Sequence, residues 1–379
     1  MKAFLSIFWV FIGFTFVAAT PSSKQISVEN SLKELNSDTK INILERMKFY
    51  NVENVSIAVI NDNRIEWAKA YGNNPSINEH TLFQAGSVSK PLTAFGVLLL
   101  VQQGKIALDE DVNVYLKRWK IPENIYIETK KVTLRQLLSH TAGTSIDGFP
   151  GYSVKGPIPD IVEILQGNKS TVNTKPILMV AEPATGMKYS GGGTLIVQLL
   201  IEDITNQPFA IWMQNNVLIP LGMCESSFEQ PLSTYKALHA APGYHNGVLM
   251  EGKWNVYPEL SAAGLWSTPR DLAKLIIYIQ CALKNEATNI LNPEFVKQMI
   301  TRQKIGGKEI ESGLGLFLEN SDQNLIFEHD GQNFGFITRF LGYAYHGKGV
   351  VIMMNNDTAW PLMKEITFSV AKSYNWPIK

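Results

Sequence analysis

The helix that the sequence predicts from Ser87 to about Gln103 constrains the fold more than any other segment. Its middle, Phe95 and Val97 to Val101, is apolar on nearly every helical face, and a helix of this kind is buried in the centre of a folded domain. Gly104 follows it as a C′ glycine would. The chain of 379 residues is long enough to bury such a helix inside one large domain or two closely packed ones.

Ser87 and Lys90 stand at the entry to this helix and form a candidate catalytic pair. Residues three apart share a helical face, with Cβ atoms roughly 5–6 Å apart, so the hydroxyl and the amine should lie side by side. Burial favours the neutral form of a lysine, which can accept a proton from a hydroxyl. The helix N-terminus favours a developing anion at the same place. We therefore interpret Ser87 as a nucleophile and Lys90 as its base; an N-cap serine is the alternative for Ser87.

The Ser-x-x-Lys spacing alone is weak support. The chain holds four such pairs, and about one or two are expected by chance. The other three are Ser37/Lys40 in a polar stretch, Ser233/Lys236 after a proline, and Ser369/Lys372 late in a predicted terminal helix. Only Ser87 and Lys90 enter a buried helix.

Two further stretches strengthen the interpretation. Tyr189 lies in a glycine-rich turn before an apolar helix, and a phenol near a lysine can relay a proton to a leaving group. His329, Asp330 and Gly331 lie at the end of a strand predicted from Leu325 to His329, where a small glycine lets a substrate lie against the strand edge. Taken singly, Tyr189 is better explained as a packed loop tyrosine and His329 as a surface histidine.

The order of predicted elements indicates the fold class. Helical periodicity at residues 25–50 and a strand hairpin at 55–71 come first, a long helical block follows, and strands return from 314 to 354 before a last helix at 360–374. We predict an α+β fold with one antiparallel sheet made by both chain ends, flanked by helices. Residues 20–80 and 305–379 would form a sheet subdomain, and residues 81–304 a mainly helical one.

Composition and spacing exclude several function classes. Lys plus Arg and Asp plus Glu balance at 34 each, which gives no basic patch for nucleic acid. The six histidines form no metal-binding pair, so we predict no metal or other cofactor. Ser87 lacks the Gly-x-Ser-x-Gly turn of α/β-hydrolases. Cys224 and Cys281 leave a disulfide or two thiols equally open.

The N-terminus predicts export. An apolar run from Ala3 to Phe16 is closed by Val17-Ala18-Ala19, which fits a signal peptide of residues 1–19 cleaved after Ala19. An uncleaved anchor helix is the alternative, but the run is short for about 30 Å of hydrocarbon. We therefore expect a periplasmic or secreted protein without stable membrane insertion after cleavage.

Together these stretches resemble the serine β-lactamase and penicillin-binding family, specifically its class C-like branch. Two secondary stretches share the resemblance, Leu137 to Gly143 and Ser261 to Leu272, and the likeness extends from about Ile43 to Trp376. The branch includes class C β-lactamases, D-Ala-D-Ala carboxypeptidases, D-aminopeptidases and esterases. The resemblance implies a β-lactamase/transpeptidase-like fold and a small-molecule or peptide substrate, such as a cell-wall peptide or a β-lactam.

The resemblance also implies roles for single residues. Ser87 would be acylated with Lys90 as base, and Tyr189 would relay a proton to Ser87 and the leaving group. The backbone N–H groups of Ser87 and Gln332 would form an oxyanion hole. The implied substrate-binding residues are His329, Gly331 and Ser190, with His329 polarising the site and orienting a substrate carboxylate.

Two departures from the family pattern bear on the substrate. Gly191 stands where the family usually has Asn, and His329 replaces a Lys, which weakens the fixed positive charge near neutral pH. With no counterpart of the separate class A glutamate, deacylation would use Lys90 and Tyr189. We expect an exported serine hydrolase that cleaves a β-lactam, a D-amino-acid peptide or a carboxylic ester. The alternative is a penicillin-binding or sensor-type relative that acylates and turns over poorly.

Overall fold

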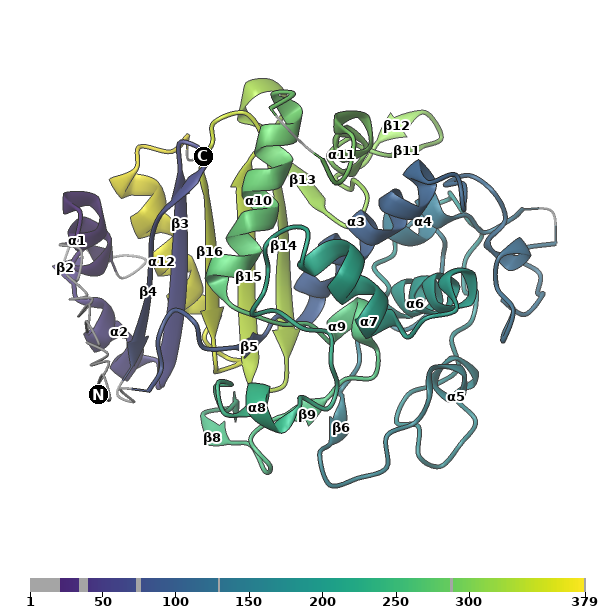
Figure 1. Cartoon of the computed structure of the whole chain (residues 1–379), viewed down its shortest axis with the longest axis horizontal. Helices are drawn as coiled ribbons and strands as arrows, with labels where there is room; N and C mark the ends of the chain where they lie inside the picture. Colours follow the sequence, from purple (N-terminus) through teal and green to yellow (C-terminus); the bar gives the residue numbers. More distant parts are fainter. Residues whose placement is uncertain (1–20, 34–39, 73–75, 129, 287–288, 378–379) are drawn as a thin grey trace, which may run out of the picture.

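The structure is a computed structural model that describes residues 21–33, 40–72, 76–128, 130–286 and 289–377. Its centre is a six-stranded antiparallel sheet in the order β13-β14-β15-β16-β3-β4, so both chain ends contribute strands (Figure 1). This confirms the predicted α+β fold. The strands are β3 Asn54–Asn61, β4 Arg64–Gly72, β13 Phe317–Glu319, β14 Ile326–Asn333, β15 Phe336–Tyr343 and β16 Gly349–Met354.

Both faces of the sheet are buried, which explains why its central strands are nearly continuous apolar runs. In β3, Val55, Ile57 and Val59 face one hydrophobic cluster, whereas Ala58 and Ile60 face the other. The first cluster includes residues of three helices near the chain ends: α1 Ser23–Glu29, α2 Ile43–Phe49 and α12 Trp360–Ser373. The second cluster includes helix α10, Pro269–Leu283, and continues into the block of helices that lies between β4 and β13 in the sequence.

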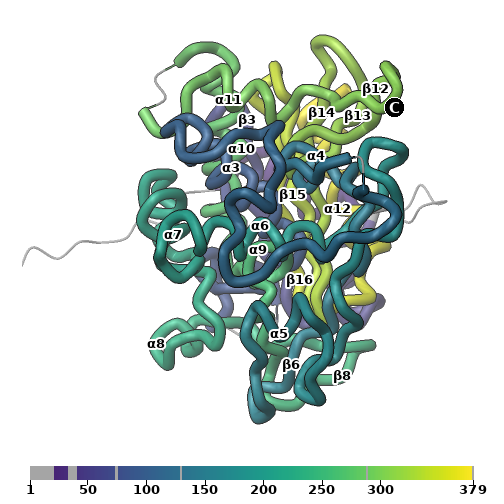
Figure 2. The backbone as a smooth tube through the Cα atoms, turned by 90° about the vertical axis from the view of Figure 1, so that its right-hand side faces the viewer, coloured from purple at the N-terminus to yellow at the C-terminus, as the bar shows by residue number. Residues whose placement is uncertain are grey.

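The helical block lies beside β14 and surrounds the predicted central helix (Figure 1). That helix, α3, has twelve buried positions among its fourteen residues, as its apolar sequence predicts. Figure 2 faces this side of the molecule and shows the long connection between α3 and α4 winding across its front. The block's helices are α3 Ser89–Gln102, α4 Leu134–Leu138, α5 Ile161–Gln166, α6 Gly191–Thr205, α7 Phe209–Met213, α8 Thr234–Ala237, α9 Leu260–Ala263 and α11 Pro293–Met299.

Short elements complete the fold. Single turns occur at η1 Gly86–Val88, η2 Val112–Val114, η3 Gln214–Leu218 and η4 Asp322–Asn324. Two-residue strands occur at β1 Leu32–Lys33, β2 Lys40–Ile41, β5 Phe83–Gln84, β6 Tyr152–Ser153, β7 Tyr244–His245, β8 Val248–Leu249, β9 Asn255–Val256, β10 Trp266–Ser267, β11 Lys304–Ile305 and β12 Lys308–Glu309. The predicted subdomain boundaries stay a prediction; α10 comes from the predicted helical segment and packs on β3 and β16.

Two expectations about the chain outside the site have structural outcomes. Cys224 and Cys281 are both free cysteines, one exposed and one half-buried. The predicted signal peptide lies outside the described residues. Within the described part of the chain, no helix combines the length and the apolarity needed to span a bilayer.

A buried ion pair joins helix α2, near the N-terminus, to helix α12, near the C-terminus. The Arg46 guanidinium of α2 binds the Glu365 carboxylate of α12 at 2.5 and 2.8 Å, and the Tyr50 hydroxyl donates to the same carboxylate at 2.7 Å. Both charged side chains are at most 3% exposed. We expect Glu365→Ala to lower the free energy of unfolding by about 3–5 kcal/mol, because it removes the acidic partner from a buried ion pair. Urea unfolding measures this; a loss below 1 kcal/mol would contradict it, with the exposed Glu45→Ala on α2 as control.

Candidate active site

Ser87 lies in η1, a tight 3₁₀ turn that delivers it to the start of α3. The preceding Gly86 has φ +53°, a left-handed conformation that favours glycine. Two hydrogen bonds to Leu265, the residue before strand β10, hold this turn in place. The Ala85 N–H donates to the Leu265 carbonyl at 2.9 Å, and the Leu265 N–H donates to Ser89 Oγ at 3.1 Å. The Ser87 side chain stays half-exposed at the end of this buried turn. The stretch around Leu265, noted from the sequence only as a secondary resemblance, therefore holds the turn of the candidate nucleophile.

Lys90 and Tyr189 converge on the hydroxyl of Ser87. Lys90 Nζ lies 2.9 Å from Ser87 Oγ, and the Tyr189 hydroxyl lies 2.8 Å from the same atom. Lys90 is 3% exposed, and its Nζ also donates to the Ala262 carbonyl of α9 at 2.9 Å. Its Nζ sits 5.0 Å from the centre of the Tyr189 ring. Two proton-transfer groups thus flank one hydroxyl, which is the geometry that nucleophilic catalysis requires.

The backbone of Ser87 abuts strand β14 at Gly331. A Cβ at position 331 would lie 2.0 Å from the Ala85 carbonyl oxygen and 3.2 Å from the Ser87 nitrogen. A Cβ at Gly86 would lie 2.7 Å from the Gln332 nitrogen. The two glycines therefore allow the contact that brings the backbone nitrogens of Ser87 and Gln332 to the same place. This is the arrangement that an oxyanion hole of those two N–H groups needs.

Strand β14 runs further than the sequence indicates. The predicted strand stops at His329, but pairing with β15 continues to Asn333, with Gly331 opposite Thr338. Cross-strand pairing overrides the turn-like composition of Asp330 and Gly331. The neighbouring strand β13 pairs only with residues 326–328 of β14, so from His329 onward that edge faces η1.

His329 is buried, not a surface histidine. It is 2% exposed, its Nδ1 lies 2.6 Å from the Asp330 carbonyl oxygen, and its ring packs 5.3 Å from Phe317 and 6.1 Å from Tyr189. Burial, reinforced by the charge of Lys90, lowers the pKa of His329 to about 3. The ring is therefore neutral at pH 7, so it offers hydrogen bonding but no positive charge to the substrate carboxylate expected from the sequence.

His140 packs against the Tyr189 ring and binds the backbone on either side of it, a role that the sequence did not indicate. Its ring centre lies 4.4 Å from that of Tyr189, its Nδ1 accepts the Ser190 N–H at 3.2 Å, and its carbonyl accepts the Lys188 N–H at 2.7 Å. Burial lowers the pKa of His140 well below its usual value. The Leu137–Gly143 stretch contained this residue, but its φ of +59° and its partners arise only in the fold.

Ser190 caps helix α6. Its hydroxyl accepts the Gly193 N–H at 2.9 Å and donates to the Ser145 carbonyl at 2.7 Å. The residue is 1% exposed. The side chain is engaged in this N-cap, and the substrate contact of Ser190 stays a prediction.

Stability is expected to fall as the pH is lowered from 6.5 toward 3, in part because of His329. The unfolded chain takes up this proton near pH 6.5, whereas the folded protein resists it until about pH 3. The unfolded state therefore binds more protons in this window, so the contribution is complete above it and is lost as the pH falls. Thermal unfolding across the window should show a shallower decline for His329→Gln; a slope equal to that of the wild type would contradict this origin.

Comparison with known proteins identifies the family of this chain. The family model described as Beta-lactamase matches residues 42–371, a range that holds every candidate site residue. The chain belongs to the β-lactamase family. This confirms the family predicted from the sequence motifs; its class C-like branch stays a prediction.

Curated relatives of this β-lactamase family chain are identical to it at about a quarter of the aligned residues. It is 26% identical over 328 residues to "Beta-lactamase-like protein 4" of Dictyostelium discoideum, covering 79% of this chain and 55% of the relative. It is 24% identical over 293 residues to "Penicillin-binding protein 4*" of Bacillus subtilis, covering 74% of this chain and 62% of the relative. The chain thus spans less than two thirds of the length of these relatives.

Solved structures share the fold. An octameric penicillin-binding protein homologue from Pyrococcus abyssi superposes with a TM-score of 0.69 at 22% identity, covering 88% of this chain and 76% of that one. A D-amino acid amidase from Ochrobactrum anthropi also gives a TM-score of 0.69, at 20% identity, covering 93% and 100%.

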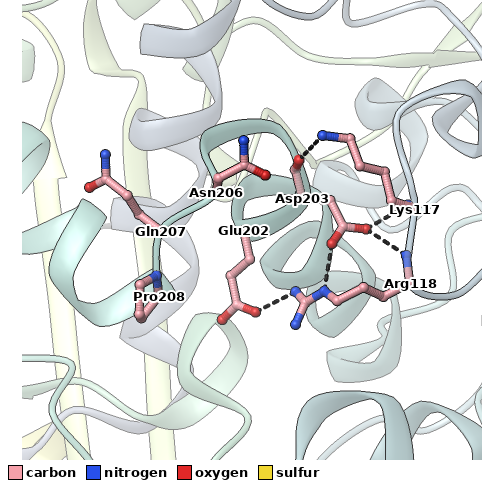
Figure 3. Close-up of a pocket in the computed structure, with 7 residues that line it drawn as sticks. All are labelled: Lys117, Arg118, Glu202, Asp203, Asn206, Gln207 and Pro208. Atoms are coloured by element: carbon pink, nitrogen blue, oxygen red, sulfur yellow. Dashed lines mark hydrogen bonds and ion pairs between the residues drawn. The ribbon is translucent and has the colours of Figure 1, made fainter.

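A pocket in this family member lies away from Ser87, between the α3–α4 connection and the end of α6 (Figure 3). Arg118 binds Asp203 and Glu202 at 2.6 Å each, and the Lys117 N–H donates to Asp203 at 2.6 Å. These charges satisfy one another and tie the connection to α6. The lining contains no serine, cysteine or histidine: it is formed by Lys117, Arg118, Glu202, Asp203, Asn206, Gln207 and Pro208.

The other Ser-x-x-Lys pairs are placed differently. Ser37 lies outside the described residues. Ser369 donates to the Val28 carbonyl at 3.1 Å while Lys372 is exposed, and Lys236 lies 3.7 Å from Glu229. Of the pairs that the structure describes in full, Ser87 and Lys90 have a hydrogen bond between serine and lysine side chains.

Proposed function

We propose that this protein is a serine hydrolase that cleaves an amide or ester bond through an acyl-Ser87 intermediate. One observation carries the proposal: Ser87 Oγ lies 2.9 Å from Lys90 Nζ and 2.8 Å from the Tyr189 hydroxyl. Membership of the β-lactamase family supports it. Within this class, the class C β-lactamase, D-Ala-D-Ala carboxypeptidase or esterase type follows from the sequence motifs alone.

The proposed acylation begins with a proton transfer from Ser87 to Lys90. Lys90 acts as the base and takes the Ser87 hydroxyl proton while Oγ forms a bond to the substrate carbonyl carbon. The carbonyl oxygen becomes an anion, and the N–H groups of Ser87 and Gln332 stabilise it. The bond to the leaving group then breaks as Tyr189 passes a proton to the departing nitrogen or oxygen, and Lys90 restores the proton of Tyr189.

Deacylation repeats these transfers with water as the nucleophile. Tyr189 and Lys90 take a proton from the water, which attacks the acyl carbon and releases Ser87 with its hydroxyl proton restored. Neutral His329 packs beside the Tyr189 ring and so helps fix its position. The products are a carboxylic acid and the free leaving group.

The Ser87→Ala variant tests the proposal directly. We expect it to lose turnover of a nitrophenyl ester by at least about 10⁴-fold, because no other group supplies the nucleophile. Ser89→Ala is not a suitable control because the Ser89 hydroxyl hydrogen-bonds to Gly86 and Leu265 and so stabilises the turn that carries Ser87. Ser369→Ala, from a Ser-x-x-Lys pair on α12, is the matched control, and we expect it to keep wild-type activity. Wild-type activity in Ser87→Ala would refute the mechanism.

A penicillin-binding or sensor-type role is the second candidate. The absence of a side chain at Gly191 and the neutrality of His329 favour it, because the first removes a polar contact and the second a positive charge for a β-lactam. Incubation with a fluorescent penicillin separates the two functions. A persistent covalent adduct without product release favours the sensor, whereas repeated turnover favours the hydrolase.

Export is also part of the proposal. The apolar run Ala3 to Phe16 and the residues Val17 to Ala19 support cleavage after Ala19. N-terminal sequencing of the mature protein should begin at Thr20. An intact Met1 on protein from the producing cell would contradict cleavage.

A further inference from the structure

The space beside Gly191, at the start of α6, is filled by an aromatic ring. A Cβ at this position would lie 3.0 Å from Cε2 and 3.4 Å from Cδ2 of Phe149, and 3.1 Å from the Asp147 carbonyl oxygen. Phe149 is itself only half-buried, whereas Asp147 and Gly148 before it are exposed. The ring thus occupies the place into which a side chain at residue 191 would extend.

That place is on the Ser87 side of the chain. Ser190 has extended backbone angles, φ −151° and ψ 115°, so side chains at residues 189 and 191 leave the backbone on the same side. The Ser190 hydroxyl points the other way, into the helix cap. Since Tyr189 reaches Ser87 Oγ at 2.8 Å, Phe149 stands on the same side of the chain as the nucleophile.

The segment that carries Phe149 is held firmly in this position. The Gly191 N–H donates to the Asp147 carbonyl at 3.1 Å, and the Gly192 N–H donates to the Ile146 carbonyl at 3.0 Å. A Cβ at Gly192 would lie 2.5 Å from the Ser145 carbonyl oxygen, so this approach requires glycine. Ile146 has φ +63°, a costly conformation for a β-branched residue that persists only where its surroundings enforce it.

The Phe149 ring makes the surface beside Gly191 apolar. The Phe317 ring lies 6.1 Å from the Tyr189 ring in stacked geometry, so an aromatic surface also adjoins Tyr189. A substrate amide pressed against such a surface loses its water without gaining a hydrogen bond. An apolar acyl chain loses nothing there and gains contact.

We propose that Phe149 is a specificity-determining residue of the Ser87 site that selects apolar acyl groups over acylamino groups beside the scissile carbonyl. This inference rests on the proposed acyl-Ser87 mechanism. Its substrate class is therefore an ester or amide of an aliphatic or aryl-substituted carboxylic acid.

Two nitrophenyl esters of matched shape test this preference. The 4-methylpentanoate and the N-acetylglycine ester share a leaving group and differ in whether an amide follows the reacting carbonyl. We expect wild-type kcat/KM to favour the 4-methylpentanoate by about 10- to 100-fold after subtraction of the Ser87→Ala background. Phe149→Ala should reduce this ratio by at least about tenfold, whereas Phe149→Leu, which stays apolar, should keep it.

A second variant keeps the test independent of folding effects at Phe149. Gly191→Asn requires the ring to move, so it should impair the wild type more than it impairs Phe149→Ala, and a double-mutant cycle measures this coupling. Circular dichroism and thermal unfolding confirm that each variant is folded. Equal turnover of both esters by the wild type, or an unchanged ratio in folded Phe149→Ala, overturns the inference and leaves the hydrolase intact. Failure of the wild type to turn over either ester refutes the proposed function instead.

Discussion

Replacing Lys90 with methionine is expected to lower kcat/KM for an activated ester by about 10³- to 10⁴-fold. Lys90 Nζ is 2.9 Å from Ser87 Oγ, and methionine keeps a long side chain in the buried site while removing the proton acceptor. General-base catalysis contributes typically about 10²–10⁴-fold, and a serine without its base is a weak nucleophile. Steady-state kinetics on folded protein measure the loss.

Lys372→Met provides the matched control for this variant. Lys372 also follows a serine by three residues, but it is exposed on α12, so we expect activity within twofold of the wild type. A loss of less than tenfold in Lys90→Met would contradict the role of Lys90. It would transfer the base function to Tyr189, whose hydroxyl lies 2.8 Å from the same oxygen.

Gly331→Ala is expected to lower kcat by about 10²–10³-fold while the protein still folds. The new methyl group would lie 2.0 Å from the Ala85 carbonyl oxygen, so β14 and the Ser87 turn must separate. Separation moves the N–H groups of Ser87 and Gln332 apart. Loss of one oxyanion-hole donor costs about this factor in kcat.

Gly186→Ala is the control for the glycine substitution. Gly186 lies three residues before Tyr189, and no atom lies within 4 Å of a Cβ built there. We expect its kcat and KM to match those of the wild type. Wild-type kcat in Gly331→Ala would show that the contact between β14 and the turn does not set the reaction rate.

The sequence predicted the fold class, and it predicted that the Ser87 and Lys90 side chains would lie next to each other, for a physical reason. The fold class rests on local sequence patterns: a buried apolar helix, a fixed Ser-x-x-Lys spacing and alternating strands. Such patterns predict secondary structure directly because they depend on residues close together in the sequence. Ser87 and Lys90 share a helical face by periodicity alone. Tyr189 was placed by its glycine-rich turn together with the family resemblance, and the structure brings its hydroxyl to Ser87.

The remaining features depend on contacts between distant segments. His329 looked like a surface histidine beside Asp330 and Gly331, but Phe317 and Tyr189 bury it. His140 and Phe149 acquire their positions from left-handed residues and from the packing of residues 144–149 onto α6. Neither arrangement has a periodic signal in the sequence.

Intact-protein mass spectrometry tests the acyl-Ser87 intermediate most directly. The protein is mixed with a nitrophenyl ester or a β-lactam, quenched in acid within the first turnovers and mapped by proteolysis. The proposed mechanism predicts a mass increase equal to the acyl group, located on the peptide that contains Ser87 and absent from Ser87→Ala. An acyl label on another residue, or an equal label on Ser87→Ala, would contradict it.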